Sequence, residues 1–292
     1  MTTDCESPPA LPAPAASGWH GELSLRYQRD AAGTGAHDRH SGPLRVLKRL
    51  YPEGPAICHH VLVHPPGGVV GGDRLDIDVE LGSGSHALIT TPGATRFYRS
   101  DGALAQQSVS LRLGADARLE WLPLETIAHA GCQAENRLRL ALAPGAEMMG
   151  WDVLALGLPA AGAGFERGSY LQHIEWPGVW QERARIDGAD TRLLDSPLGW
   201  AGHRVLGTLW FGAGTALGSA RRDALLDGAR EALMLDADAW PAGASSPHDG
   251  LVLVRVLGAR TEGVLQRLER VRAAWRQLAW GLPANRPRVW ST

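Results

Sequence analysis

The 292-residue sequence is short of cysteine and phenylalanine and contains no long apolar segment. Its three cysteines, Cys5, Cys58 and Cys132, have no C-x-x-C spacing and form no even set. This argues against a disulfide framework and is typical of a reducing compartment, so we expect a cytoplasmic location. Runs of about 18 apolar residues are absent, so no membrane-spanning helix is expected. The formal net charge of −2 gives no sign of binding to nucleic acid or to a membrane surface.

Signatures of nucleotide binding and of common hydrolases are missing as well. Residues 67–72 read GGVVGG, which has neither the G-x-G-x-x-G spacing nor the Gly-Lys-Ser/Thr ending of a P-loop, and a strand pattern follows. The chain has no G-x-S-x-G, no H-E-x-x-H and no Cys/His pairing at metal-ligand spacing. We therefore predict a protein that is not an enzyme. The alternative is a hydrolase or transferase that uses the Gly-rich segment as an anion site.

The beginning of the chain differs in composition from the rest. Residues 1–18 are rich in proline and alanine, and they lack the basic start and apolar core of a secretory signal. We expect a disordered arm there, followed by one β-rich domain over residues 19–292.

Most of the domain alternates apolar and polar residues, as β-strands do. Similar turns begin at Leu81, Leu113 and Leu142, each after an alternating strand, and they recur about every 30 residues. The pattern predicts a mostly β fold of stacked antiparallel strands or hairpins, in a quasi-solenoid or sandwich-like body. The alternative is an ordinary β protein that reuses one kind of turn.

Two segments near the C-terminal third have helical periodicity instead. Residues 219–235 and 261–280 carry apolar side chains at intervals of three and four. The arginines of the second helix, at positions 267, 270, 272 and 276, suggest a solvated face or, as the alternative, a partner contact.

A proline- and glycine-rich segment after an apolar strand requires an unusual backbone. Prolines fix φ and remove backbone donors, whereas glycines permit positive φ and close approach. We expect a sharply bent structural crossing between strands, formed by Pro65, Pro66, Gly67, Gly68, Gly71 and Gly72.

Several acidic residues lie within apolar strands, where a carboxylate is unfavourable unless it is paired or hydrated. One interpretation is that they form internal ion pairs that fix the strand register. The other is a polar internal passage, lined by carboxylates and hydroxyls that bind a divalent cation weakly enough to release it. The candidates for such a passage are Asp73, Thr95, Glu120, Asp152 and Glu182. No fixed metal site is predicted, because His60 and His64 lie about 13 Å apart along one strand and His59 faces the other way.

Four motifs resemble those of the UreD/UreH family of urease accessory proteins. They are HPPGGVVGGD at 64–73, TPGATRFYRS at 91–100, LEWLPLETI at 119–127 and the closing PRVWST at 287–292. The resemblance extends in the same order from about residue 19 to the end of the chain. It departs from the family at residues 128–132, where a phenylalanine-rich segment is usual.

The resemblance implies a mostly β fold with two helices and a role in delivering nickel to apo-urease. It further implies a complex with a UreF-type accessory protein, which recruits a UreG-type GTPase that carries the nickel. A homodimer within that complex is left open, and nickel in transit is the only cofactor implied. This favours the passage over the alternative of a purely structural docking protein.

Overall fold

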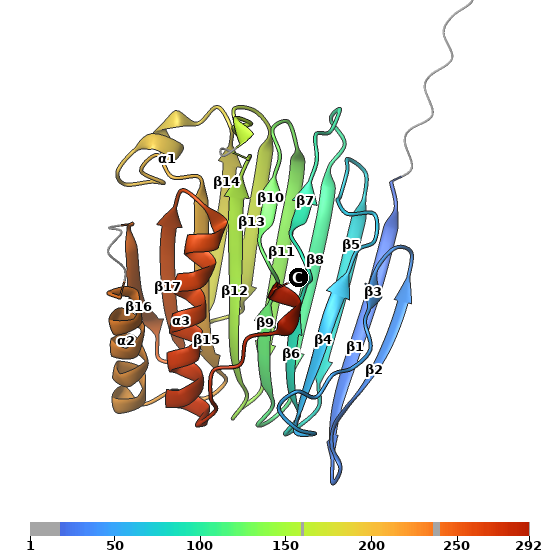
Figure 1. The fold of residues 1–292 in the computed structure, drawn as a ribbon, viewed down its shortest axis with the longest axis vertical. Helices are drawn as coiled ribbons and strands as arrows, with labels where there is room; N and C mark the ends of the chain where they lie inside the picture. Colours follow the sequence, from blue (N-terminus) through green and yellow to red (C-terminus); the bar gives the residue numbers. More distant parts are fainter. Residues whose placement is uncertain (1–17, 159–160, 236–239, 292) are drawn as a thin grey trace, which may run out of the picture.

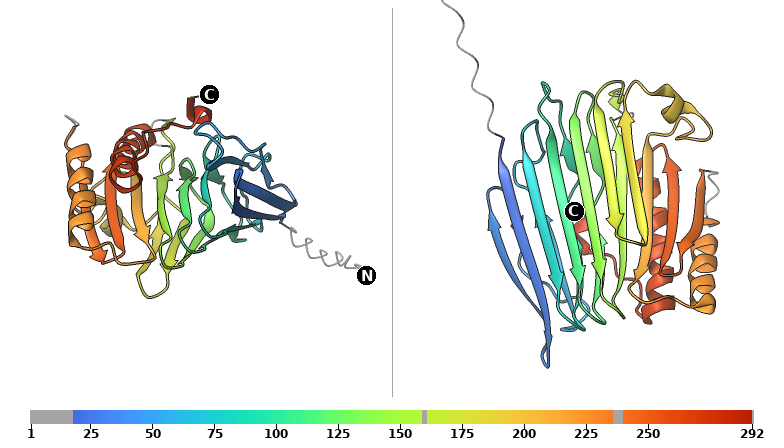
Figure 2. Two further views of the ribbon diagram at one scale, coloured as in Figure 1. Left: turned by 90° about the horizontal axis from the view of Figure 1, so that it is seen from below. Right: turned by 180° about the vertical axis from the view of Figure 1, so that it is seen from behind.

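The computed structural model describes residues 18–158, 161–235 and 240–291. Two large β-sheets stack face to face, and helices cover the outer side of one of them (Figure 1). The end-on view in Figure 2 shows these layers most clearly. The predicted arm at residues 1–18 falls, apart from Gly18, outside the described residues. None of the helices in the described ranges is both long and apolar enough to cross a membrane.

Sheet 1 has seven strands, and its members in spatial order are β14 (Trp180–Asp187), β13 (Ser169–Trp176), β11 (Gln133–Leu142), β8 (Ala105–Leu113), β5 (Arg74–Leu81), β1 (His20–Asp30) and β2 (Gly33–Ser41). Sheet 2 has ten strands, and its main path is β16 (Ala242–His248), β17 (Leu251–Gly258), β15 (Val205–Ala213), β12 (Glu147–Leu156), β9 (Arg118–Leu122), β6 (His86–Thr90), β4 (Ile57–Val63) and β3 (Arg45–Val46). Two short strands branch from sheet 2, β10 (Thr126–Ala128) and β7 (Thr95–Phe97).

The chain alternates between the sheets, which confirms the stacked, solenoid-like body. Strand β5 is followed by β6, β8 by β9 and β11 by β12, with the first of each pair in sheet 1 and the second in sheet 2. Because each unit contributes one strand to each sheet, stacked units place strands of the same direction side by side. The central neighbours in both sheets are therefore parallel. Antiparallel pairing, which we expected throughout, occurs at both ends of sheet 1, in β1–β2 and β13–β14, and in sheet 2 in β3–β4 and across β12, β15, β17 and β16.

The sequence repeat corresponds to three turns stacked on one another. Leu81 pairs with Leu113, and Leu113 with Leu142, so the turns begin in register. The Gly84 N–H of the first turn donates to the Ala115 carbonyl of the second at 2.9 Å. Equivalent positions, Gly84, Asp116 and Gly145, have positive φ values of 66°, 55° and 77°. Glycine and aspartate are among the residues that accept this conformation most readily.

Three α-helices are present in the described part of the chain, namely α1 (Thr191–Asp195), α2 (Ser219–Leu233) and α3 (Thr261–Trp280). Helices α2 and α3 match the two predicted segments, whereas the short α1 was not predicted. Helix α3 ends at Gly281, which has the left-handed φ of 64° that terminates helices. A one-turn 3-10 helix, η2 (Arg288–Ser291), follows and lies across the middle of sheet 2 (Figure 1).

Two apolar cores result from this layering. One lies between the sheets and includes Leu25, Val79 and Leu111, and the other lies between sheet 2 and the helices and includes Val254 and Trp275. The space between the sheets is thus a separate compartment from the space under the helices.

The close packing of α3 on sheet 2 gives a test of the fold. A Cβ at Gly207 of β15 would lie 2.5 Å from Val264 Cγ1 and 3.0 Å from Leu268 Cδ1. Gly207→Val should push α3 outward and lower the free energy of unfolding by roughly 1–3 kcal/mol in urea denaturation. In the control Gly243→Val, on edge strand β16, the added Cβ meets no atom within 4 Å, and the change should stay within about 0.5 kcal/mol. Equal destabilisation by both would contradict this packing.

Candidate functional site

A cavity of about 310 Å³ lies between the two sheets. The Gly-rich segment and residues 91–96 form one side of it, and residues of β8, β11 and β12 form its floor. Its polar lining consists of His64, Thr91, Thr95, Arg96, Gln107, Thr126, Asn136 and Asp152. The remaining lining is apolar and includes Trp121 and Leu138. Oxygen and amide groups therefore predominate among the polar atoms that the cavity offers.

The Gly-rich segment packs tightly against β7 at the edge of this cavity. The Val69 N–H donates to the Arg96 carbonyl at 2.7 Å, and the Tyr98 N–H donates to the Val69 carbonyl at 2.9 Å. A Cβ at Gly68 would lie 2.0 Å from the Tyr98 ring, so only glycine permits this approach. Gly67 and Gly72 have φ values of 79° and 94°. Gly67 and Gly68 line the cavity, so the bent crossing helps to shape it.

Thr95 and Asp152 are two of the predicted passage residues, and the structure brings both to this cavity. Thr95 begins β7 and pairs with Thr126 of β10, so two hydroxyl-bearing side chains lie side by side. Asp152 projects from β12 toward sheet 1, where the amide of Asn136 approaches its Oδ1 at 3.4 Å. No salt bridge among the described residues includes Asp152.

The pKa of Asp152 is raised to about 7, first by burial and then by the negative charge of Glu182. A favourable contact with Gln172 offsets part of this increase. The Asp152 side chain lies deep in the protein but keeps some accessible surface, because it faces the cavity rather than packed atoms. An acid of this kind changes its charge near neutral pH.

Glu182 lies on β14, the edge strand of sheet 1, and does not line the cavity. It forms a salt bridge with Arg255 of β17, which joins the edge of sheet 1 to sheet 2. Its side chain is 20% exposed. Glu182 is nevertheless close enough to influence the ionisation of Asp152.

Asp73 lies beside the Gly-rich segment and also does not line the cavity. Its two carboxylate oxygens accept hydrogen bonds from the backbone N–H groups of Trp19, at 2.8 Å, and Val70, at 3.0 Å. It therefore ties the start of β1 to the crossing.

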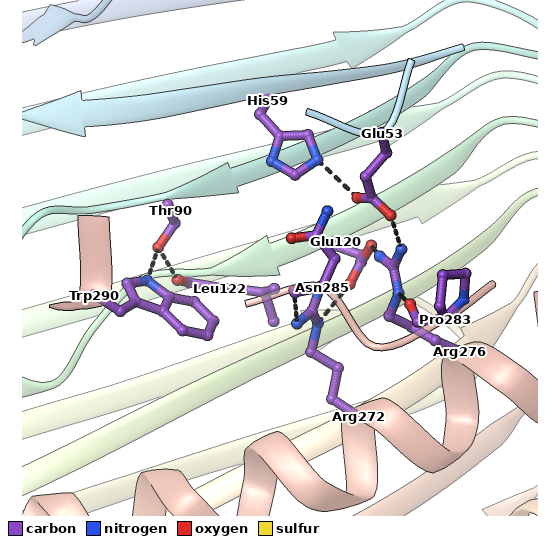
Figure 3. A network of polar contacts seen from close by, with 10 residues as sticks. All are labelled: Glu53, His59, Thr90, Glu120, Leu122, Arg272, Arg276, Pro283, Asn285 and Trp290. Atoms are coloured by element: carbon purple, nitrogen blue, oxygen red, sulfur yellow. Dashed lines mark hydrogen bonds and ion pairs between the residues drawn. The ribbon is translucent and has the colours of Figure 1, made fainter. Parts of the chain in front are cut away.

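Glu120 lies on the opposite face of sheet 2, beneath α3, and is fully buried. Its two oxygens accept hydrogen bonds from Arg272, at 2.6 Å, and from Arg276 (Figure 3). Arg276 also pairs with Glu53, which in turn accepts a hydrogen bond from His59 at 2.9 Å. Burial opposes the ionisation of Glu53, but His59 and Arg276 outweigh it and lower the pKa of this carboxyl.

The arginines of α3 also hold the segment that follows the helix. Arg272 donates to the Asn285 carbonyl at 2.8 Å, and Arg276 donates to the Pro283 carbonyl at 2.9 Å (Figure 3). Arg267, Arg272 and Arg276 are almost completely buried. The expectation that these arginines lie on a solvated face was therefore wrong for these three, because Arg272 and Arg276 face the Glu120 carboxylate in the sheet and Arg267 packs over the Trp240 ring.

The closing motif is anchored near the cavity from the outside. Trp290 Nε1 donates to Thr90 Oγ1 at 2.7 Å, and Thr90 donates to the Leu122 carbonyl at 2.6 Å (Figure 3). The Trp290 ring also packs on Trp151, with ring centroids 5.3 Å apart. The C-terminal segment thus supports strands whose loops form the wall of the cavity.

Metal-ligating side chains do not gather at one point. In residues 18–158, 161–235 and 240–291, no group of three His, Cys, Asp or Glu side chains could hold an ion. His59 pairs with Glu53 and His60 with the Tyr27 hydroxyl, at 2.9 and 2.6 Å, while His64 lines the cavity.

Sequence reasoning missed Glu53 and the inward amides Gln107, Asn136 and Gln172. A signal for two amides was present, because Gln107 alternates with Val109 and Leu111, and Asn136 with Leu138. The spacing of Arg272 and Arg276 by four residues, on the stripe of Leu268, was a comparable signal for a buried pair.

The fold and the site together define a class. The protein is a solenoid-like β protein with a cavity whose polar lining is mainly hydroxyl, amide and carboxylate groups, and its sequence lacks the nucleotide-binding and hydrolase motifs considered above.

Comparison with known proteins identifies the family. The model of the UreD urease accessory protein family matches residues 20–291. The urease accessory protein UreD of Leptothrix cholodnii is 62% identical over 276 residues, which cover 94% of this chain and 99% of that protein. The UreD proteins of Variovorax paradoxus and Methylibium petroleiphilum are 59% and 55% identical, with the same coverage. The chain belongs to the UreD family of urease accessory proteins, in agreement with the resemblance of the four motifs.

The buried carboxylate under α3 gives the first test of the site. Glu120→Gln removes the charge that compensates Arg272 and Arg276, so the free energy of unfolding should fall by roughly 3–5 kcal/mol. The matched control is Asp78→Asn, which breaks an exposed pair with Arg112 and should cost less than about 1 kcal/mol. Urea denaturation of both variants checks this, and a loss of less than about 1 kcal/mol for Glu120→Gln would contradict the assignment.

The raised pKa of Asp152 predicts a pH dependence of stability. The unfolded chain releases this proton near pH 3.8 and the folded chain near pH 7. Between these values the folded state binds more protons, so rising pH lowers the free energy of unfolding, by up to about 4 kcal/mol. Asp152→Asn should remove this loss, so the variant should gain stability over the wild type from pH 4.5 to pH 8. An unchanged difference at the two pH values would contradict the burial of this acid.

Proposed function

We propose that the chain is a urease maturation factor that binds apo-urease and lets nickel pass through the space between its sheets. In this proposal the chain is a scaffold and a conduit without catalytic activity of its own. A UreF-type accessory protein binds it, and a UreG-type GTPase joins through that partner and supplies the nickel. The family membership supports the accessory role, and the cavity supports the passage.

The observation that carries the passage is Asp152. It is an acid in the interior that faces hydroxyl and amide groups and has no cationic side chain as its partner among the described residues. A buried carboxylate without such a partner is unfavourable in a structural core, because nothing compensates for its charge. A route for a divalent cation explains why an acid stands there, because a nearby cation favours the ionised carboxylate. Oxygen ligands also bind nickel weakly enough for release.

Thr95 and Glu182 extend this route in two directions. Thr95 lies at the loop side of the cavity, and the partly exposed Glu182 lies on the edge strand of sheet 1, close enough to Asp152 to affect its ionisation. Asp73 and Glu120 do not belong to this route, since each is held by hydrogen bonds away from the cavity. We assign the passage to Thr95, Asp152 and Glu182, and a structural role to Asp73 and Glu120.

The second candidate is a docking protein without a passage. It is favoured by the pairing of Asp73, Glu120 and Glu182, which is what a purely structural role for the acids would produce. The two candidates differ only in what Asp152 and the cavity do.

The variants Asp152→Asn and Thr95→Val separate the candidates. Both are close to isosteric and leave the ion pairs intact, so the accessory complex should form in normal yield. Nickel per urease active site, measured by atomic absorption after activation in cells, should fall severalfold for Asp152→Asn and less for Thr95→Val. Glu120→Gln serves as the contrasting variant and should lose the complex itself through lost stability. Wild-type nickel content in the Asp152→Asn strain, with normal complex yield, would favour docking alone.

A further inference from the structure

Three amides, the partly buried Gln107 and the buried Asn136 and Gln172, form a row on the inner face of sheet 1. Gln107, Asn136 and Gln172 occupy paired positions on the adjacent strands β8, β11 and β13. Gln107 Nε2 donates to Asn136 Oδ1 at 3.2 Å, and Asn136 Nδ2 approaches Gln172 Oε1 at 3.4 Å. These residues, called the amide row below, face Asp152 across the gap between the sheets.

The amide row is not satisfied by protein atoms alone. Gln172 is 5% exposed, and its Nε2 has no hydrogen-bond partner among the residues that the structure describes. It is close enough to Asp152 to favour ionisation there, but makes no hydrogen bond of ordinary geometry. Because an unpaired buried donor costs about 1–3 kcal/mol, such groups are usually hydrated. Asn136 joins this row to the cavity.

The row is also poorly suited to replace the water around a metal ion. The Asn136 oxygen already accepts from Gln107, and the Gln172 oxygen accepts from Asn136 and from the Tyr170 hydroxyl at 3.2 Å. Asp152 is then the one charged ligand on this part of the lining. An octahedral divalent ion that lost its roughly six waters here would gain fewer and weaker ligands in exchange.

The cavity is large enough for a divalent ion that keeps its first shell of water. Since one water takes about 30 Å³ of liquid volume, a cavity of this size could hold about ten waters. An ion with its first water shell would fit, with its waters donating to Asp152 and hydrogen-bonding to the amides.

We propose that the amide row binds the hydration shell of the divalent cation, so that nickel crosses the protein as a hydrated ion. This inference rests on the proposed function and adds the chemical form in which nickel passes. Two consequences follow. Wild-type protein retains no nickel once free ion is removed, and it does not discriminate nickel from other divalent ions of similar hydrated size.

The test introduces a nitrogen ligand into the row. Gln172→His, with Asn136→His as a second variant, would place an imidazole beside Asp152, where it can bind nickel directly. The control is Gln181→His on the exposed side of β14. Each full-length chain is purified with a co-expressed UreF-type partner but without the nickel-carrying GTPase, incubated with nickel chloride, desalted and analysed for metal. Urease activation is measured in parallel.

We expect about one nickel retained per chain for the variants in the row, against none for wild type and the control. Activation should fall severalfold in the row variants because the ion is trapped. Gln172→Leu should lower activation without retaining nickel, since it removes the groups that bind the water shell.

Two results would overturn the inference. One is nickel retained by the wild-type chain through direct protein ligands, seen as a metal-edge absorption spectrum with altered first-shell distances. The other is full activation by Gln172→Leu while Asp152→Asn is impaired, which would leave the passage in place but remove the amide row from it. If Asp152→Asn also activates fully, the passage itself fails.

Discussion

The Glu120 carboxylate, which is held between Arg272 and Arg276, is the buried contact that attaches α3 and the C-terminal segment to one face of sheet 2. It binds α3 to the sheet, and through the same arginines it holds the chain after the helix against the strands. Such a buried ionic group is weak evidence for net stability, because an apolar substitute of equal shape could serve as well. What it does provide is a specific orientation, since one carboxylate binds two arginines of α3 at the same time.

Asp152 on the neighbouring strand β12 has the opposite environment, without a cationic partner among the described residues. Glu120 faces the helix and is neutralised, whereas Asp152 faces sheet 1 and meets amides and hydroxyls. The two faces of a single sheet thus separate a closed structural core from a polar interior. The solenoid-like stacking makes this possible, because it creates a long inter-sheet space that inward side chains of successive units can line in register.

Much of the fold was predictable from local pattern. Alternation in Leu75–Leu81 and the recurring turns at Leu81, Leu113 and Leu142 predicted stacked strands, and helical spacing predicted α2 and α3. The parallel pairing of the central strands was not predictable this way, because it depends on the two strands of each unit joining different sheets. That choice is made by long-range packing rather than by any local signal.

The site was predictable only in part. Thr95 and Asp152, two of the residues expected to line a polar passage, do line one cavity, whereas their role in a passage stays a prediction. Glu120 has the same local pattern as Asp152, yet faces the other way, and only the position of α3 explains the difference. The amides were overlooked because neutral polar residues at inward positions attract less attention than charges, although their burial is equally informative.

A reversible plug in the cavity tests the central claim most directly. In Thr95→Cys, made in a Cys5→Ser background, a bulky methanethiosulfonate reagent should attach to the cysteine at the cavity wall, while the wild-type Cys58 and Cys132 are buried. The preformed accessory complex carrying this label should transfer little nickel to apo-urease, and removal of the label with a reductant should restore transfer. The same label on Ser83→Cys, in an exposed turn between β5 and β6, should have no effect. Undiminished transfer by the complex labelled at position 95 would contradict a route for nickel between the sheets.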